Sequence, residues 1–395
     1  MLSREKEPIR VLQLIAPNTL GGAEKVVLSL QEWLATGEDE SPQFIPSLGI
    51  FIWVRRPQNV FLREVRAKGY PHIIFPMRFA FDWANLIQLA RYLKASRIKL
   101  LHTHGYRSDI VGLFCARIAG IPAVTTLHGW TATDWRVRTY EWGQRLILPF
   151  FEAIIAVSEQ IADQLVKQRG IAPGKVRLLP NAVRIPQEDV DLTERHRVRR
   201  QFGCDPEALV VGFVGRLSSE KNPADLLKAI SLLTPRLPKL VCWIVGEGPQ
   251  RLSLERQAEE LGIARQVSFL GFQADMGRIY QALDVLAITS RTEGTPLALL
   301  EAMSFGLPVV SMRVGGIGDL LDGGVEGLLV NPGDTAAMAD SLARVLTDPQ
   351  LAKELGRAAR KKVQTHFAID VWISHLRRVY RECLEAHLLR QTLRA

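Results

Sequence analysis

The sequence predicts an α/β protein built from two similar domains, each a parallel sheet with helices on both faces. Short apolar runs alternate with amphipathic helical segments along the chain, which is the pattern of parallel strands joined by helical crossovers. The pattern starts again at Ala208, after a polar stretch that is poor in strand-forming residues. A length of 395 residues also favours two domains over one. Both halves open with a strand that leads into a loop suited to phosphate.

The first series begins with a strand at Arg10–Ala16, followed by Gly21-Gly22 and a helix over Ala23–Leu34. The later elements that we expect in this half are strands at Ile98–His104, Ala123–Leu127 and Ala153–Val157, and a helix at Asp109–Ala119. Ser158 is a good N-cap and predicts a helix after the last of these strands.

In the second series, Asn222-Pro223 predicts an N-cap and first residue for a helix that ends at Leu233, and Asp334 predicts another cap. We expect strands at Leu209–Val214, Leu240–Val245, Val267–Leu270, Asp284–Thr289, Pro308–Ser311 and Gly327–Val330. The polar stretch Asp189–Gln201 is the expected linker, with domains at 1–185 and 186–370 and a last helix near Ile369–Leu389.

Composition is that of an ordinary globular chain, with 47% hydrophobic and 23% charged residues. The four cysteines are far apart and form no C-x-x-C pair, so we expect buried or incidental reduced thiols and a cytoplasmic protein. The amino terminus has only a short apolar run and predicts a tail leading into a strand, not a signal peptide. No stretch approaches the roughly 20 apolar residues of a membrane span.

The net charge of +9 comes from the first half of the chain. Residues 1–185 hold 24 Lys and Arg against 15 Asp and Glu, whereas residues 186–395 hold 26 of each. Basic residues mix there with aromatic ones around 53–56, 78–83 and 130–138. One interpretation is a face that binds an anionic membrane; the alternative is solvated charge beside core aromatics, and charge alone does not decide between them.

Two glutamates, Glu293 and Glu301, flank the start of a predicted helix. Thr295 is a suitable N-cap, Pro296 a suitable first helical residue, and Gly306 a suitable end. The free N–H groups at such a helix start attract phosphate, and the carboxylates can accept hydrogen bonds from hydroxyl groups. Phosphate together with hydroxyl groups points to a nucleotide sugar.

The stretch SRTEGTPLALLEAMSFGLPVV, residues 290–310, resembles the E-x7-E motif of retaining glycosyltransferases of the GT4 type, also called glycosyl transferases group 1. The resemblance implies the GT-B fold, in which two Rossmann-like domains face one another across a cleft. It also implies that the last helix, about 371–395, crosses back to the first domain. In this family, Glu301 would bind ribose hydroxyls, while Glu293 and the backbone of Thr295, Pro296 and Leu297 would hold the donor.

Two cations follow the first strand of the second half. Arg216 and Lys221 lie in a loop before a helix, where they can neutralise a leaving diphosphate without a metal ion. They are similar to the family's diphosphate clamp. Gly21 and Gly22 resemble the family's glycine loop, where the missing side chains allow the backbone to approach a ligand.

His128 ends a predicted strand, where parallel sheets place ligands, and it looks like the family's active-site histidine that reaches the donor sugar. The usual following Asp is replaced by Gly129, so a His–Asp pair is not expected. Gly246 and Gly271 follow later strands and are similar to turns that line the nucleotide. The loop Gly315-Gly316 resembles the family's glycine-rich loop, and Asn181 suggests a turn near the hinge.

Two other patterns suggest metal binding but are expected to be coincidental. Asp189-Val-Asp191 spells a D-x-D motif, but it lies in the polar linker and not at the end of an apolar strand. His102 and His104 share one side of a strand, yet a zinc site needs further ligands. We therefore expect no cofactor and no strict metal requirement.

Together these residues predict a retaining glycosyltransferase of the hexosyltransferase type that uses a UDP-sugar or GDP-sugar. The resemblance suggests a glycan or lipid-linked acceptor in polysaccharide or glycolipid synthesis, on the inner face of the membrane, and no nucleic acid partner. Two alternatives remain open: a nucleotide-sugar epimerase on the same fold, and a non-catalytic scaffold that binds glycan or membrane.

Overall fold

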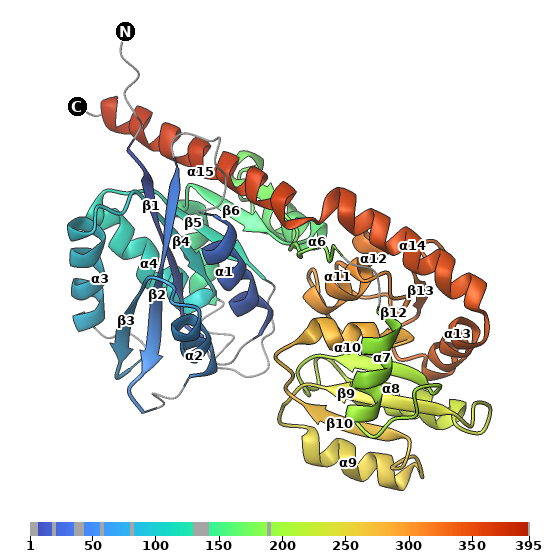
Figure 1. The fold of residues 1–395 in the computed structure, drawn as a ribbon. Helices are drawn as coiled ribbons and strands as arrows, with labels where there is room; N and C mark the ends of the chain where they lie inside the picture. Colours follow the sequence, from blue (N-terminus) through green and yellow to red (C-terminus); the bar gives the residue numbers. More distant parts are fainter. Residues whose placement is uncertain are drawn as a thin grey trace. The chain divides into compact units, whose positions relative to one another are not determined.

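The computed structural model describes residues 7–17, 21–34, 43–55, 59–79, 83–128, 142–187 and 191–393. The chain forms two compact units, one of Met1–Pro180 with Asp370–Ala395 and the other of Asn181–Ile369 (Figure 1). The division at Pro180 lies slightly before the expected position at residue 185. The segment returning to the first unit begins at Asp370, close to the expected start of the last helix.

The first unit is a parallel sheet in the order β3-β2-β1-β4-β5-β6-β7. Its strands are β1 Ile9–Ile15, β2 Phe44–Trp53, β3 His72–Met77, β4 Leu100–His104, β5 Ala123–Leu127, β6 Ala153–Ala156 and β7 Val176–Leu178. Its helices are α1 Gly22–Trp33, α2 Val60–Ala67, α3 Trp83–Ala95, α4 Tyr106–Ala119, α6 Glu159–Asp163 and α15 Ile369–Thr392. Residues 142–147 are also helical and lead into the short turn η1 Leu148–Phe150; η2 Gln164–Gln168 and η3 Pro173–Lys175 follow α6.

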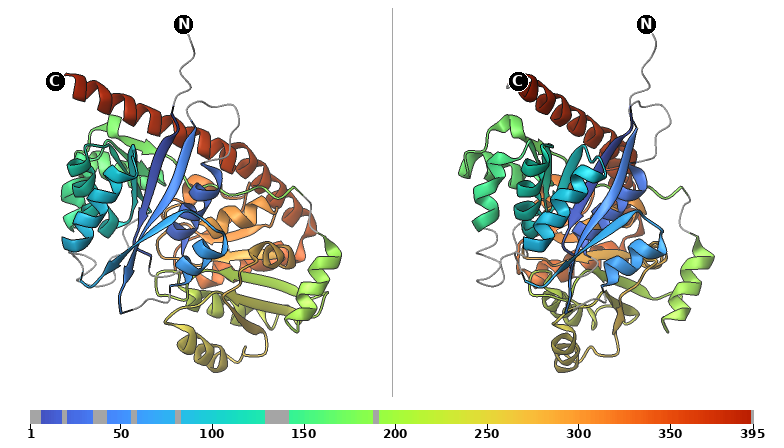
Figure 2. Two further views of the ribbon diagram at one scale, coloured as in Figure 1. Left: turned by 60° about the vertical axis from the view of Figure 1, so that its left-hand side comes forward. Right: turned by 90° about the vertical axis from the view of Figure 1, so that its left-hand side faces the viewer.

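Successive side chains along the central strands point to opposite faces of the sheet, and each face has its own hydrophobic core. On β1, Leu12 and Leu14 pack with residues of α3 and α4, whereas Ile15 packs with residues of α1 and α2. Strand residues two apart share a face, so Gln13 points to the same side as Ile15. Helix α15 also covers this side: its Tyr380 bonds to Gln13, and the helix runs along the unit in both views of Figure 2.

The second unit is a parallel sheet in the order β10-β9-β8-β11-β12-β13. Its strands are β8 Leu209–Val214, β9 Leu240–Val245, β10 Val267–Gly271, β11 Val285–Ile288, β12 Val309–Met312 and β13 Leu328–Val330. Its helices are α7 Leu192–Gln201, α8 Pro223–Leu233, α9 Arg251–Glu260, α10 Met276–Ala282, α11 Leu297–Ser304, α12 Ile317–Leu320, α13 Thr335–Thr347 and α14 Pro349–His366. Ser158, Asn222 and Asp334 occupy the expected N-cap positions, of which Ser158 and Asp334 accept a backbone N–H with their side chains.

The prediction of a linker at Asp189–Gln201 is wrong, because most of this stretch is helix α7 of the second unit. Arg199 is only 2% exposed and donates to the backbone oxygens of Ala282 and Ala208. Its guanidinium also pairs with Asp284 at 2.7 Å. The polar character of the stretch comes in part from Arg195 and Arg199, which both pair with Asp284 inside the unit.

The four cysteines are free and buried, as expected. Within the described ranges, no helix combines the length and the apolar character that crossing a bilayer would need.

Candidate functional site

The second unit reverses its strand order beside β8. Strand β9 lies on one side of β8 and β11 on the other, so the loops that follow β8 and β11 leave the sheet next to each other at the carboxyl ends of the strands. Open parallel sheets bind ligands at such a reversal. The loop after β8 carries Arg216 and Lys221, and the loop after β11 carries Glu293.

Lys221 and Glu293 form an ion pair between these two loops. The lysine Nζ lies 2.6 and 2.7 Å from the two carboxylate oxygens, and the Glu293 side chain is only 7% exposed. Ser290 donates a further hydrogen bond to the same carboxylate. The sequence predicted a cation for the diphosphate and a carboxylate for the sugar, and the structure shows that these two groups hold one another.

Other groups of the β8 loop add to the local charge. Arg216 is exposed on the same loop. Burial raises the pKa of Glu220, and the neighbouring Glu293 carboxylate acts in the same direction, while Lys221 and Arg216 oppose it. The backbone oxygen of Glu220 accepts from Arg291 N–H at 2.8 Å, which ties the two loops together through the main chain.

Helix α11 begins one residue later than expected. Pro296 is the N-cap, with an extended backbone (φ −69°, ψ 122°), so neither Thr295 nor Pro296 is helical. The first backbone hydrogen bond of the helix is donated by the Leu299 N–H to the Pro296 oxygen at 3.1 Å. The N–H of Leu297 precedes it and has no acceptor within the helix. Gly306 ends the helix as expected, with φ +69° and an N–H bond to Met303.

Glu301 is held by Tyr280, a residue that sequence reasoning missed. The phenol donates to Glu301 Oε2 at 2.7 Å, and burial, followed by the carboxylate, raises the pKa of Tyr280 well above its usual value. Nothing in the sequence pairs these residues, because Tyr280 reads as a core position of an amphipathic helix. The bond fixes the direction of a carboxylate on the first turns of α11.

Two glycines allow the loops to approach more closely than side chains would permit. A Cβ on Gly315 would lie 1.9 Å from the backbone oxygen of Glu293, and φ is +51° there. A Cβ on Gly246, where φ is +132°, would lie 1.9 Å from the oxygen of Gly215. In the structure, Gly246 is thus required for contact between loops, which is distinct from the predicted contact with nucleotide. Gly271 has a φ of +66°, in the left-handed region that favours glycine.

Asn181 has a more specific position than the predicted turn. Its side-chain amide donates to the backbone oxygen of Thr295 at 2.8 Å, and both residues are buried. Asn181 therefore supports the loop that joins Glu293 to α11.

In the first unit, Gly21 caps α1 after strand β1. Its N–H donates to the Glu24 carboxylate at 3.0 Å, which satisfies one of the unpaired donors at the helix start. A Cβ on Gly22 would meet nothing within 4 Å. Packing does not require a glycine at 22, so the predicted approach of a ligand to this backbone remains a prediction.

His102 and His104 are members of a buried hydrogen-bond network. His102 contacts the Tyr380 hydroxyl through Nδ1 at 2.6 Å and Thr126 through Nε2 at 2.8 Å. His104 Nε2 lies 2.8 Å from the Gln13 amide oxygen, and the Gln13 amide nitrogen donates to Tyr380 at 3.0 Å. Tyr380 belongs to α15, so the network joins the last helix to the centre of the sheet.

His128 stacks on this network from the end of β5. Its ring centroid lies 5.9 Å from that of His104. Burial lowers the pKa of His128 to about 4 and that of His102 to about 3, with His128 adding to the shift of His102. Burial and both neighbours lower the pKa of His104 as well. All three imidazoles are therefore neutral near pH 7.

A second buried network lies on the α4 side of the same sheet. Asp109 accepts hydrogen bonds from Thr103, Thr125 and Gln144. Burial raises the pKa of Asp109 to about 6, although these bonds pull in the opposite direction. The network fixes residues 142–147 against α4.

Across the described ranges, no group of three or more His, Cys, Asp or Glu side chains is arranged to hold a metal ion. In the D-x-D sequence, Asp191 caps α7 by accepting Thr193 N–H at 2.8 Å, and Asp189 lies outside the described residues. The position of Gly129, after His128, is likewise not described.

Comparison with protein families matches both units. Residues 194–362 match the model for glycosyl transferases group 1, and residues 20–185 match that for glycosyltransferase family 4. A D-inositol 3-phosphate glycosyltransferase of Saccharomonospora viridis is 33% identical over 79% of this chain and 76% of its own length. An Escherichia coli UDP-Gal:alpha-D-GlcNAc-diphosphoundecaprenol alpha-1,3-galactosyltransferase is 26% identical over 80% of this chain and 84% of its own.

Solved structures share the fold. Anabaena HepE in complex with UDP aligns with a TM-score of 0.81 at 22% identity, over 95% of this chain and all of the other. Sucrose-phosphate synthase of Thermosynechococcus elongatus aligns with a TM-score of 0.77 at 22% identity, over 96% of this chain and all of its own. With two Rossmann-like units and matches over both, the chain belongs to the group 1 glycosyltransferases of the GT-B fold, enzymes that use nucleotide sugars.

Proposed function

We propose that the chain is a retaining transferase that moves a sugar from a UDP-sugar or GDP-sugar to a lipid-linked glycan at the cytoplasmic face of a membrane. The observation that carries the donor part is the Lys221–Glu293 pair at the reversal of strand order, with Arg216 on the same loop. The name of the Escherichia coli relative, which gives a diphosphoundecaprenol-linked acceptor, supports the acceptor class.

In this proposal, the cations stabilise the leaving diphosphate. Lys221 uses two of its three N–H donors on Glu293 and keeps one for a phosphate oxygen. As the bond between sugar and diphosphate breaks, negative charge grows on that oxygen, and fixed cations lower the barrier without a metal ion. The N–H groups at the start of α11 favour the same charge.

The two carboxylates would bind hydroxyl groups. Glu301, directed by Tyr280, would accept from the ribose, and Glu293 from the sugar. For retention, the acceptor oxygen bonds to the anomeric carbon on the face that the diphosphate leaves, and its proton passes to the leaving phosphate. The roles of Gly22 and His128 toward the donor stay predictions.

Two measurements test this function. A thermal-shift panel of UDP- and GDP-sugars identifies the donor, since a ligand at 100 times its Kd stabilises by about 2.7 kcal/mol. Proton NMR of the product made with a detergent-solubilised polyprenyl diphosphate glycan then gives the anomeric configuration. We expect the transferred sugar to keep the anomeric configuration that it has in the donor. An inverted product would overturn the retaining mechanism, and an epimer formed without acceptor would favour an epimerase.

A further inference from the structure

One side of the first unit carries large apolar side chains that face solvent. We call this the apolar face: Phe114 and Ile118 of α4, Trp142 and Leu146 of the helical turns at 142–147, and Phe150 of η1. These five side chains are 50–64% exposed. Residues four apart share one side of a helix, so the spacing of 114 and 118, and of 142 and 146, places each pair on a common side.

The segments that carry the apolar face pack against one another. Gln144 donates to Asp109 in the first turns of α4. Farther along, the Arg117 guanidinium donates to the Phe150 backbone oxygen at 3.1 Å and lies 5.8 Å from the Phe150 ring centroid. Residues 142–150 thus run alongside α4 in the same direction, and their exposed side chains form one surface. Leu388, Leu389 and Leu393 near the end of α15 are 60–86% exposed as well.

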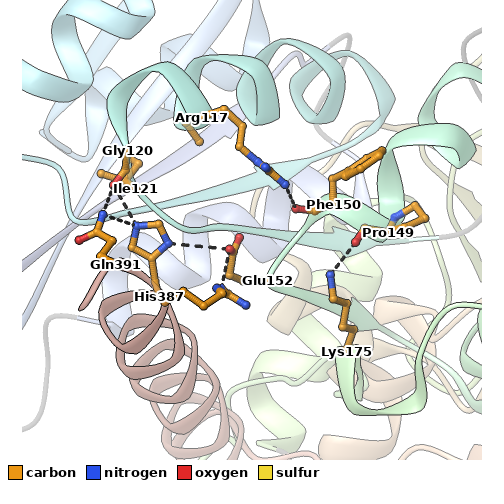
Figure 3. Close-up of a pocket in the computed structure, with 11 residues that line it drawn as sticks. Arg117, Gly120, Ile121, Pro149, Phe150, Glu152, Lys175, His387 and Gln391 are labelled. Atoms are coloured by element: carbon orange, nitrogen blue, oxygen red, sulfur yellow. Dashed lines mark hydrogen bonds and ion pairs between the residues drawn. The ribbon is translucent and has the colours of Figure 1, made fainter. Parts of the chain in front are cut away.

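A basic pocket adjoins the apolar face at Arg117 and Phe150 (Figure 3). It has a volume of about 350 Å³ and includes the cations Arg117, Lys175 and Arg390 among its lining residues. Among the described residues that line the pocket, Glu152 is the single carboxylate, and it pairs with Arg390 at 2.8 Å. Lys175 and Arg117 donate to backbone oxygens, which satisfies hydrogen bonds but leaves positive charge in excess.

The charges in the pocket act on one another. Burial lowers the pKa of Lys175; Glu152 opposes the shift, while Arg390 and Arg117 add to it. Three cations around one carboxylate favour an anion between them. An apolar surface beside a cationic pocket has the chemistry of a bilayer interface, where side chains enter the acyl boundary and cations contact lipid phosphates.

We propose that the apolar face docks on a bilayer of anionic lipid, with a headgroup phosphate in the basic pocket. This proposal rests on the lipid-linked acceptor proposed above and identifies the surface that would bring the enzyme to it. A second copy of the chain fits less well, because a symmetric pair would bring the same cations together. Of the aromatic and basic groups expected from sequence, Trp53 is half-buried, with the Arg107 guanidinium 5.0 Å from the centroid of the Trp53 ring, whereas Phe79 is 57% exposed. Residues 130–138 lie outside the described residues, so that part of the expectation stays a prediction.

Sedimentation with vesicles tests the surface. We expect the protein to bind vesicles of phosphatidylcholine with about 30% phosphatidylglycerol at least tenfold more strongly than phosphatidylcholine alone, since anionic lipid attracts cationic residues. Phe114→Asp with Leu146→Asp should lower this binding at least tenfold, and Lys175→Gln severalfold. Leu252→Asp, at a position 70% exposed in the second unit, and Arg236→Gln, at a surface ion pair with Asp340, are the matched controls and should change binding less than twofold.

Equal binding by the double variant and the Leu252→Asp control would overturn the proposal, as would a wild type that ignores anionic vesicles. Light scattering adds another outcome: a wild-type dimer that becomes a monomer in the double variant would assign the face to a second copy instead. Transfer to the acceptor in detergent separates the two proposals. If the docking surface is right, the double variant keeps this activity, whereas a wild type that binds vesicles but transfers nothing would fail only as the proposed enzyme.

Discussion

Lys221 and Glu293 in the second unit meet as a charged pair between two loops, whereas His102, His104 and Tyr380 in the first unit meet as neutral groups within the fold. The surfaces of the two units differ in their exposed apolar side chains. Among the described residues, the second unit contributes only Leu192, Leu232, Leu252, Phe272 and Val325 to the exposed large apolar side chains, and the first unit contributes all the others. The second unit thus concentrates charge at its candidate site, whereas the first unit combines a buried network of neutral histidines with an apolar and basic surface.

The largest expected effect sharpens this comparison in the second unit. Gly315→Ala would place a Cβ 1.9 Å from the Glu293 backbone oxygen at a φ of +51°. We expect the loop to shift, donor affinity to fall at least 100-fold, and stability to fall by about 3 kcal/mol or more. Urea unfolding and donor calorimetry measure these losses. Gly318→Ala is the control, because nothing lies within 4 Å of its added Cβ; equal losses in both variants would contradict the close-approach argument.

Acid should break the first unit before the second. The three buried histidines have folded pKa values lowered well below 6.5, so the unfolded chain binds more protons as pH falls below 6.5, and stability is lost. Asp109, with its pKa raised to about 6, offsets one of these protons. The net slope is about 3 kcal/mol per pH unit between about pH 6 and 4.5.

The histidines of the second unit are His196 and His366, and both lie outside its core. Because the folded pKa of Glu220 is raised, the folded second unit binds this proton more readily than the unfolded chain, which favours the folded state as pH falls. Hydrogen exchange at pH 7 and pH 5, corrected for intrinsic rates, should show β4 and β5 losing protection while β8 and β11 keep theirs. Simultaneous loss in both units would show that the histidines do not dominate acid stability.

Two tyrosines offer a matched pair of deletions, one in each unit. Tyr380→Phe leaves the buried His102 and Gln13 without the hydroxyl that they contact, and we expect a loss of about 2–3 kcal/mol in urea unfolding. Tyr280→Phe removes the hydroxyl that donates to Glu301. Because Glu301 is only half-buried and can be solvated by water, we expect the free energy of unfolding to fall by about 1 kcal/mol. The reverse order would mean that the histidine network contributes little to stability.

The smallest structural effect is expected at Gly22. Because a Cβ there meets nothing within 4 Å, Gly22→Ala should change stability by less than about 1 kcal/mol. If the backbone at Gly22 approaches the donor, as predicted, turnover should nevertheless fall about tenfold. Unchanged turnover would remove this residue from the candidate site.

Local patterns in the sequence predicted much of the fold. Strands β8 and β9 and the helix after Asn222 have the expected positions because their periodicity and caps are local signals. Strands β2 and β3 were missed, since Pro46, Gly49 and Pro76 interrupt their apolar runs. The sequence of helix α7 suggests a linker because the partner of Arg199, Asp284, lies far along the chain.

The residues of the candidate site could be predicted from local sequence, but the contacts between them could not. Glu293, Glu301, Arg216 and Lys221 were identified from a motif and from charges next to helix starts. The Lys221–Glu293 contact spans 72 positions, and Tyr380 lies 278 positions from His102. Such pairs depend on tertiary packing, so no single segment of sequence contains them.

The most direct test of the donor site is the turnover number of Lys221→Ala, measured against Arg236→Ala at saturating donor. We predict a loss of about 100-fold for Lys221→Ala, the magnitude found for single electrostatic stabilisers, and less than a twofold change for Arg236→Ala, at a remote surface cation. A loss below tenfold at Lys221, in protein that melts as a folded chain, would contradict the claim that this lysine stabilises the leaving diphosphate.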